Sequence, residues 1–206
     1  MTQKERIIEV SLQQFLEHGI KQMTIQKLIE PLGLSTKTVY KYFADKEDLL
    51  KQCLFLHYTK LTERFTLLEK AMSNPVDGIL LFFYELFKTD FGINHTFYYD
   101  LNFYFPQLQD LILENFSSIG IVKLKSILVE GLEEGFFIRD FNADIFIETM
   151  MVLYTSITRN NKLKQLNCSP IILMQNTLEA YIRGVCTEKG LISFNDFQKS
   201  KNEIKY

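Results

Sequence analysis

The sequence contains little of what holds small secreted proteins together or anchors proteins in membranes. Its 206 residues include three cysteines, Cys53, Cys168 and Cys186, whose spacing forms no pair typical of a disulfide framework. The longest apolar run, residues 79–84, is far shorter than the ~20 residues that span a bilayer. The polar, charged N-terminus carries no secretory signal. We therefore expect a cytoplasmic protein that makes no contact with a membrane.

Tryptophan is also absent, and neither sign of charge dominates, since the formal net charge is −2 at pH 7. Proteins dominated by phosphate binding usually carry a larger basic excess. Residues 1–51 hold 8 Lys and Arg against 7 Asp and Glu, and residues 52–206 hold 15 against 18. A case for nucleic-acid binding must therefore rest on where the cations lie, because their total number does not support it.

The motifs of common catalytic and metal sites are missing as well. The sequence has no G-x-S-x-G elbow, no P-loop and no H-E-x-x-H pair. His18, His57 and His95 stand alone, which favours surface or core positions over metal ligation. Cys53 and His57 could share a helix face, but no third residue orients the histidine, so packing is the better interpretation. We predict no enzymatic activity, no cofactor and no metal site.

What the chain does contain is a series of capped amphipathic helices, beginning with two near the N-terminus. Thr2 and Glu5 form a capping-box pattern that opens the first helix, and Gly19 follows its end. Thr24 can cap a second helix, in which Pro31 removes one backbone hydrogen bond and predicts a local bend. The apolar residues of this second helix follow the i, i+3, i+4, i+7 spacing and are Ile25, Leu28, Ile29 and Leu32.

The next segment, G-L-S-T-K-T-V-Y-K-Y-F-A-D-K (residues 33–46), is the most informative of the chain. Gly33 permits a sharp turn, and Ser35 can cap a helix that we expect to extend to Phe43. Val39 and Phe43 share one face of that helix. The other face holds only hydroxyl groups and cations, which suits phosphates and base edges. It consists of Thr36, Lys37, Thr38, Tyr40, Lys41 and Tyr42. An ordinary solvated face is the alternative, but the helix, turn and helix arrangement favours DNA.

From Lys4 to about Leu54, roughly a quarter of the chain, the sequence resembles the DNA-binding domain of the TetR/AcrR family of bacterial transcriptional regulators. The resemblance is carried by R-I-I-E-V-S-L-Q-Q-F-L-E-H-G, M-T-I-Q-K-L-I-E-P-L-G-L-S-T-K-T-V-Y-K-Y-F and D-K-E-D-L-L. It implies that residues around Thr36 to Thr38 read bases. It also implies phosphate contacts by Thr24, Tyr40, Tyr42 and Lys46. Two residues depart from the family pattern and affect details of docking. Pro31 stands at a position that is commonly charged or small, and Tyr42 stands where His is frequent.

The whole chain is predicted to be all-α. We place a helix-turn-helix DNA-binding domain in residues 1–50 and a helical effector-binding and dimerisation domain in residues 51–206. No run of β alternation is bounded by hairpin turns, and three prolines fit first helical positions. The helices expected after the N-terminal three cover Asp45 to Ala71 and residues near 75–90, 95–104, 106–134, 144–160 and 170–188.

The larger domain is dense in aromatic residues between positions 82 and 105. These could line a cavity for an apolar or aromatic effector, with tyrosine hydroxyls, Asn94 or His95 orienting the ligand. The candidate lining residues are Phe83, Phe87, Tyr98, Tyr104 and Tyr154. The alternative is that they fill the core, as large side chains at helical spacing usually do.

The helix expected at 144–160 is apolar nearly all round, so it must be covered on more than one side. Its neighbour at 170–188 carries a second apolar stripe. A two-fold interface between two copies of the chain would cover both, and the candidate residues are Leu153, Ile157, Met174, Leu178 and Ile182. Coverage by earlier helices of the same chain is the alternative. The family resemblance implies a homodimer formed by the last two long helices and favours the interface.

These inferences predict a ligand-responsive transcriptional regulator, with repression favoured over activation. It would bind a palindromic double-stranded DNA operator as a homodimer and be released by a small apolar or aromatic effector of unknown identity. The alternative function is a helical small-molecule or acyl-chain-binding module whose DNA-binding domain is not used. The complete set of basic and hydroxyl residues on the face of residues 36–42 favours the regulator.

Overall fold

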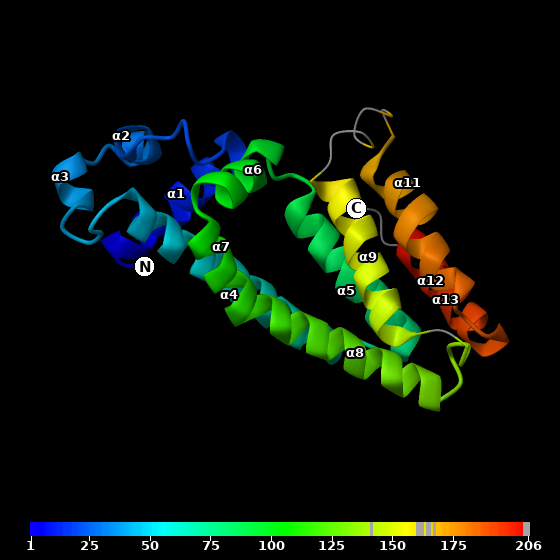
Figure 1. Ribbon diagram of the computed structural model, residues 1–206. Helices are drawn as coiled ribbons and strands as arrows, with labels where there is room; N and C mark the ends of the chain where they lie inside the picture. Colours follow the sequence, from blue (N-terminus) through cyan, green and yellow to red (C-terminus); the bar gives the residue numbers. More distant parts are fainter. Residues whose placement is uncertain (141, 160–162, 164–165, 167, 204–206) are drawn as a thin grey trace. The chain divides into compact units, whose positions relative to one another are not determined.

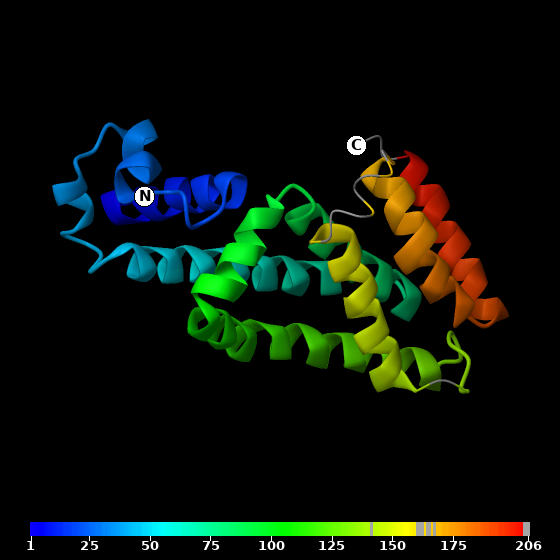
Figure 2. The ribbon, with the colours of Figure 1, turned by 45° about the horizontal axis from the view of Figure 1, so that its top comes forward.

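The computed structural model describes residues 1–140, 142–159, 163, 166 and 168–203, and the regular elements in them are helices. The predicted all-α fold is confirmed (Figures 1 and 2). The α-helices are α1 (Gln3–His18), α2 (Ile25–Ile29), α3 (Thr36–Val39), α4 (Lys46–Glu69), α5 (Pro75–Asp90), α6 (His95–Tyr104), α7 (Pro106–Ile112), α8 (Ser118–Glu133), α9 (Ala143–Thr158), α11 (Pro170–Met174), α12 (Ala180–Gly184) and α13 (Glu188–Glu203). A 3₁₀ turn, η1 (Glu30–Leu32), and two π-helical turns, η2 (Leu113–Ser117) and η3 (Gln175–Glu179), complete the set. Among the described residues, none of these helices has the length and apolar character needed to cross a bilayer.

The chain divides into two compact units, and α4 contributes to both. Unit 1 comprises residues 1–63 and 92–118, and unit 2 comprises residues 64–91 and 119–206. The functional boundary expected after residue 50 therefore falls within a continuous helix, and it stays a prediction.

Local signals in the sequence account for the first helices of unit 1. The Thr2 hydroxyl accepts the Glu5 amide at 3.2 Å, and the Glu5 carboxylate accepts the Thr2 amide at 2.7 Å, so the predicted capping box of α1 is confirmed. Helix α2 ends at Ile29, and Pro31 lies in the separate 3₁₀ turn η1, so the second helix is shorter than the continuous, bent helix expected from the sequence. Gly33 then adopts the left-handed conformation, with φ of 61°, that allows the sharp turn.

The core of unit 1 forms where the apolar stripes of α1, α2 and α3 meet. Ile7, Phe15, Leu28 and Val39 are fully buried there. Helix α6 packs against α1, as Figure 1 shows. Phe97 of α6 is buried in the same core. Residues 92–118 thus complete a core that the N-terminal helices begin.

In unit 2, α5 packs against α9 and α13, and α9 packs against η3. The chain segment of α11 and α12 lies beside α13 in both views (Figures 1 and 2). This packing corrects the interface expected from the sequence, because a single chain already buries Ile157, Met174, Leu178 and Ile182 completely and Leu153 in part. Most of the stripe that we assigned to a second copy is the core of unit 2.

The helices expected at 106–134, 144–160 and 170–188 differ from their predicted boundaries. The segment expected as one helix at 106–134 is interrupted by η2, and the one at 170–188 is interrupted by η3 and ends at Gly184. Helix α9 ends at Thr158, and its expected end at Asn160 lies outside the described residues. Helix α13 was not predicted at all. Its sequence is largely charged and polar, with Phe194 as a buried residue.

Candidate functional site

The candidate DNA-binding segment begins with a capped turn of helix. The Ser35 hydroxyl accepts the Thr38 amide at 3.2 Å and lies 3.0 Å from the Thr38 hydroxyl, so Ser35 is the N-cap of α3 as predicted. The predicted extension of this helix to Phe43 is wrong, since α3 ends at Val39. The Val39 carbonyl accepts both the Tyr42 amide, at 2.9 Å, and the Phe43 amide, at 3.1 Å. The first of these bonds is of the i→i+3 kind that tightens a helix end.

Although the helix is short, the two faces of the segment separate as expected. Val39 and Phe43 are buried in the core of unit 1. Thr36, Lys37 and Lys41 are exposed, Tyr40 is 56% exposed, and Thr38 is half-buried beside Ser35. No carboxylate occurs between residues 35 and 44. The outward surface of residues 35–42, called the reading surface below, therefore offers only hydroxyl, ammonium and backbone groups to a partner.

Two residues that the resemblance assigned to phosphate binding also make contacts within the protein. The Tyr42 hydroxyl donates to the side-chain oxygen of Gln3 at 3.0 Å, which ties the reading surface to the first turn of α1. The Thr24 hydroxyl accepts the Lys27 amide at 3.3 Å and caps α2. Both residues are exposed. Their contacts with DNA stay predictions.

Lys46 occupies a different environment from the one expected for a phosphate ligand. Its ammonium donates to the Ile20 carbonyl at 2.5 Å and lies 3.4 Å from the Lys21 carbonyl, in the loop between α1 and α2. Burial lowers the pKa of Lys46, and the carboxylate of Asp100 opposes that shift. The structure thus shows Lys46 positioning a loop. A phosphate contact by the same side chain stays a prediction.

Asp100 of α6, a residue that the sequence analysis missed, also holds this loop. One carboxylate oxygen of Asp100 accepts the Ile20 amide at 2.8 Å and the Lys21 amide at 2.7 Å, and the side chain is buried. Gly19, with φ of 84°, makes the close approach possible: a Cβ there would lie 2.6 Å from the Thr96 hydroxyl. Because this loop leads directly into α2, Asp100 helps to set where the helix-turn-helix begins.

The five residues predicted to contact an effector do not share one pocket. Tyr98 and Tyr104 belong to unit 1, where Tyr98 is buried and the Tyr104 hydroxyl accepts a hydrogen bond from the Lys21 ammonium at 2.5 Å. Phe83, Phe87 and Tyr154 belong to unit 2 and are buried in its core. These positions agree with the alternative that the aromatic residues fill the cores.

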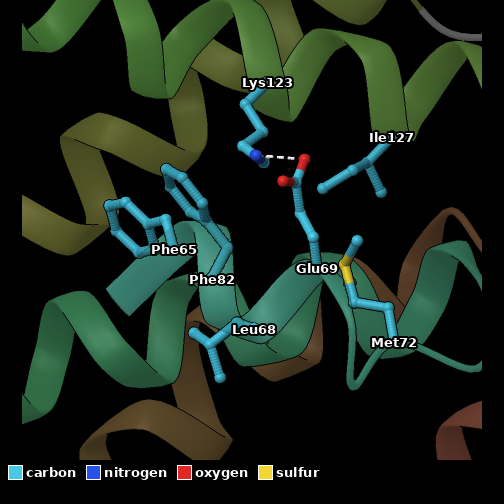
Figure 3. Close-up of a pocket in the computed structure, with 8 residues that line it drawn as sticks. Phe65, Leu68, Glu69, Met72, Phe82, Lys123 and Ile127 are labelled. Atoms are coloured by element: carbon cyan, nitrogen blue, oxygen red, sulfur yellow. Dashed lines mark ion pairs between the residues drawn. The ribbon is translucent and has the colours of Figure 1, made fainter. Parts of the chain in front are cut away.

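A small pocket of unit 2 lies elsewhere, between the end of α4, the start of α5 and α8 (Figure 3). Its cavity volume is about 10 Å³, room for roughly one water molecule. The ammonium of Lys123 and the carboxylate of Glu69 form an ion pair there. The lining residues are Phe65, Leu68, Glu69, Met72, Gly78, Phe82, Lys123 and Ile127. These three segments are not marked by any shared local pattern in the sequence, so the pocket could not be predicted from it.

Comparison with known proteins agrees with the helix-turn-helix arrangement of the N-terminal helices. Residues 7–53 match the model of a family described as bacterial regulatory proteins, tetR family. The chain is 22% identical over 151 residues to the HTH-type transcriptional repressor KstR2 of Mycobacterium tuberculosis, which covers 70% of this chain and 74% of that protein.

Solved structures share the fold over nearly the whole chain. The ketosteroid transcriptional regulator KstR2 of M. tuberculosis has a TM-score of 0.67 at 20% identity, covering 91% of this chain and 96% of that one. FadR of Bacillus subtilis in complex with stearoyl-CoA has a TM-score of 0.68 at 19% identity, covering 88% and 98%. A TetR transcription regulator from Haloarcula marismortui reaches 0.74 at 20% identity, covering 90% and 98%.

Substitution of Lys37 by Ala tests the reading surface. We expect a loss of about 1–3 kcal/mol in binding to the selected DNA site and a relaxed preference at one base position, because a lysine can donate to guanine acceptors in the major groove. Fluorescence anisotropy with specific and random duplexes measures both. Lys70→Ala, at an exposed lysine outside the reading surface, should bind like the wild type. Equal losses of Lys37→Ala on both kinds of duplex would assign Lys37 to phosphate contact.

Substitution of Asp100 by Ala tests the loop contact. Two backbone amides lose their acceptor, so we expect the free energy of unfolding to fall by about 1–3 kcal/mol and DNA affinity to fall with it. Asp100→Asn keeps an acceptor oxygen and should lose less. Urea unfolding and DNA titration provide the measurements, with exposed Asp110→Ala of α7 as the control. Wild-type stability and affinity in Asp100→Ala would show that the contact has no positioning role.

Proposed function

We propose that this chain, a DNA-binding transcriptional regulator of the TetR family, acts as a homodimeric repressor that a small molecule releases from a palindromic operator. The observation that carries the proposal is the exposed, acid-free reading surface, built on a capped helix-turn-helix whose apolar side is buried. Regulators of this family are not enzymes. Repression is supported by the similarity to KstR2, which is described as a repressor.

On the operator, Thr36, Lys37 and Thr38 are the residues that we assign to base edges. The Lys37 ammonium donates to guanine O6 or N7, and the threonine methyl groups meet thymine methyl groups. Tyr40 and Tyr42 contact the sugar-phosphate backbone and fix the register of the helix in the groove. Two copies related by a two-fold axis then read two half-sites one or more helical turns apart.

The effector acts through unit 2, because α4 links the pocket to the DNA-binding domain along one helix. Its first residue, Lys46, contacts the loop before α2, and its last residue, Glu69, lines the pocket. A ligand changes DNA affinity only if it binds two conformations of the protein unequally. The relatives described as a ketosteroid regulator and as a complex with stearoyl-CoA support an apolar effector. Such a regulator works in the cytoplasm of a bacterium, where its DNA is.

A dimer must use residues that the single chain leaves exposed. Ile145 and Val152 lie seven residues apart on one face of α9 and are 64% and 61% exposed. Ile171 and Ile172 at the start of α11 are also exposed. We assign the two-fold interface to these four residues, in place of the buried stripe expected from the sequence.

Selection of bound sequences from a pool of random duplexes tests the function. We expect a palindromic consensus, because each subunit of a two-fold dimer presents the same reading surface. The pool is selected with the full-length protein and again with a Thr36→Ala, Lys37→Ala, Thr38→Ala triple variant as the matched control, which should yield no consensus. Failure of the wild-type protein to retain any duplex at low salt would favour the alternative, a ligand-binding module with an unused DNA-binding domain.

Substitution of Val152 by Glu tests the interface. A charge in a desolvated interface is costly, so we expect monomers by light scattering at concentrations where the wild type is dimeric. Val122→Glu on α8 is the control, because Val122 is 67% exposed and lies outside the assigned interface. Circular dichroism checks that both variants fold. If Val152→Glu still forms dimers at micromolar concentration, the interface lies on another surface of the protein.

A further inference from the structure

The pocket of unit 2 combines an apolar lining with a single pair of opposite charges. Glu69 and Lys123 point toward each other and form an ion pair, and the other side chains that line the pocket are apolar (Figure 3). The Phe65 and Phe82 rings stack in its wall, with centroids 4.5 Å apart and planes 13° from parallel. An amphiphile, with an apolar body and one charged group, matches this combination.

The two charged partners differ in how easily each can leave the pair. The Glu69 side chain is 42% exposed and can turn into water, whereas that of Lys123 is only 21% exposed. An ammonium left unpaired in a largely covered position costs free energy. Glu69 is also the last residue of α4, and this helix has no basic residue in its last turn. A carboxylate is disfavoured at that end by the helix dipole. Lys123 is therefore the retained partner and Glu69 the exchangeable one.

Movement of one side chain, that of Met72, can open the apolar part of the pocket. Met72 fills the space over Gly78, where an added Cβ would lie 2.7 Å from the Met72 sulfur. Methionine is unbranched and changes conformation readily, and Met72 is only half-buried. A ligand that displaced Met72 would therefore gain contact with Ile127 and the two stacked rings without disrupting the helices.

We propose that this pocket binds an apolar molecule bearing one carboxylate group. The ligand carboxylate takes the place of Glu69 at the Lys123 ammonium, and the apolar part takes the place of Met72. The inference rests on the proposed function, because the ligand it describes is the effector. Release of Glu69 leaves an unpaired carboxylate in the last turn of α4, where the helix dipole disfavours it. The first residue of the same helix holds the loop before α2.

The test compares carboxylates with the corresponding neutral alcohols on the full-length protein. Decanoate and 1-decanol form one pair of probes, and 4-phenylbutyrate and 4-phenyl-1-butanol form another. Isothermal titration calorimetry should show at least one carboxylate binding tenfold or more tightly than its alcohol. Lys123→Gln should abolish this preference. Lys125→Gln should preserve it, because the Lys125 ammonium does not line the pocket and pairs at 2.6 Å with the exposed Asp144 of α9.

A second variant makes the result independent of how well Lys123→Gln folds. Glu69→Gln removes the competing carboxylate, so it should tighten carboxylate binding several-fold and leave alcohol binding unchanged. Equal affinity for acid and alcohol in both probe pairs, or an acid preference that survives in Lys123→Gln, would overturn the inference.

Operator binding by the ligand-free wild type, measured in parallel, separates this inference from the proposed function. If the protein binds its operator but shows no preference for acids, the assigned ligand class is wrong and the proposed repressor function stands. If it prefers acids but does not bind an operator, the ligand site stands and the proposed repressor function is wrong.

Discussion

One carboxylate in α6 and one ammonium at the start of α4 fix the loop on which the DNA-binding domain depends. Asp100 accepts the Ile20 and Lys21 amides, while Lys46 donates to the carbonyls of the same two residues. This loop leads into Thr24, the cap of α2. Since short helices owe most of their stability to packing and caps, the placement of α2 and α3 follows from this arrangement.

Features that depend on neighbouring residues could be predicted from the sequence. The capping box at Thr2 and the turn at Gly33 are local, and the structure has both. The early end of α3 and the π-helical turns within the expected helices at 106–134 and 170–188 were not predictable in this way. They reflect packing against distant segments, which propensity does not register.

The two candidate sites differ in predictability for the same reason. The reading surface is contiguous, so its residues and exposure could be anticipated almost completely. The pocket joins Glu69 to Lys123, far apart in the chain, and Asp100 meets a loop about eighty residues earlier. Periodicity likewise showed that Leu178 and Ile182 must be covered, but it could not show whether the same chain or a second copy covers them.

The brevity of α3 has a consequence for the substitutions that its exposed positions can accept. Val39 and Phe43 anchor this segment in the core, whereas the side chains at 36 and 37 are exposed. Exposed positions of this kind tolerate most substitutions within about 0.5 kcal/mol of folding free energy. Residues 36 and 37 can therefore be exchanged at little cost to the stability of unit 1.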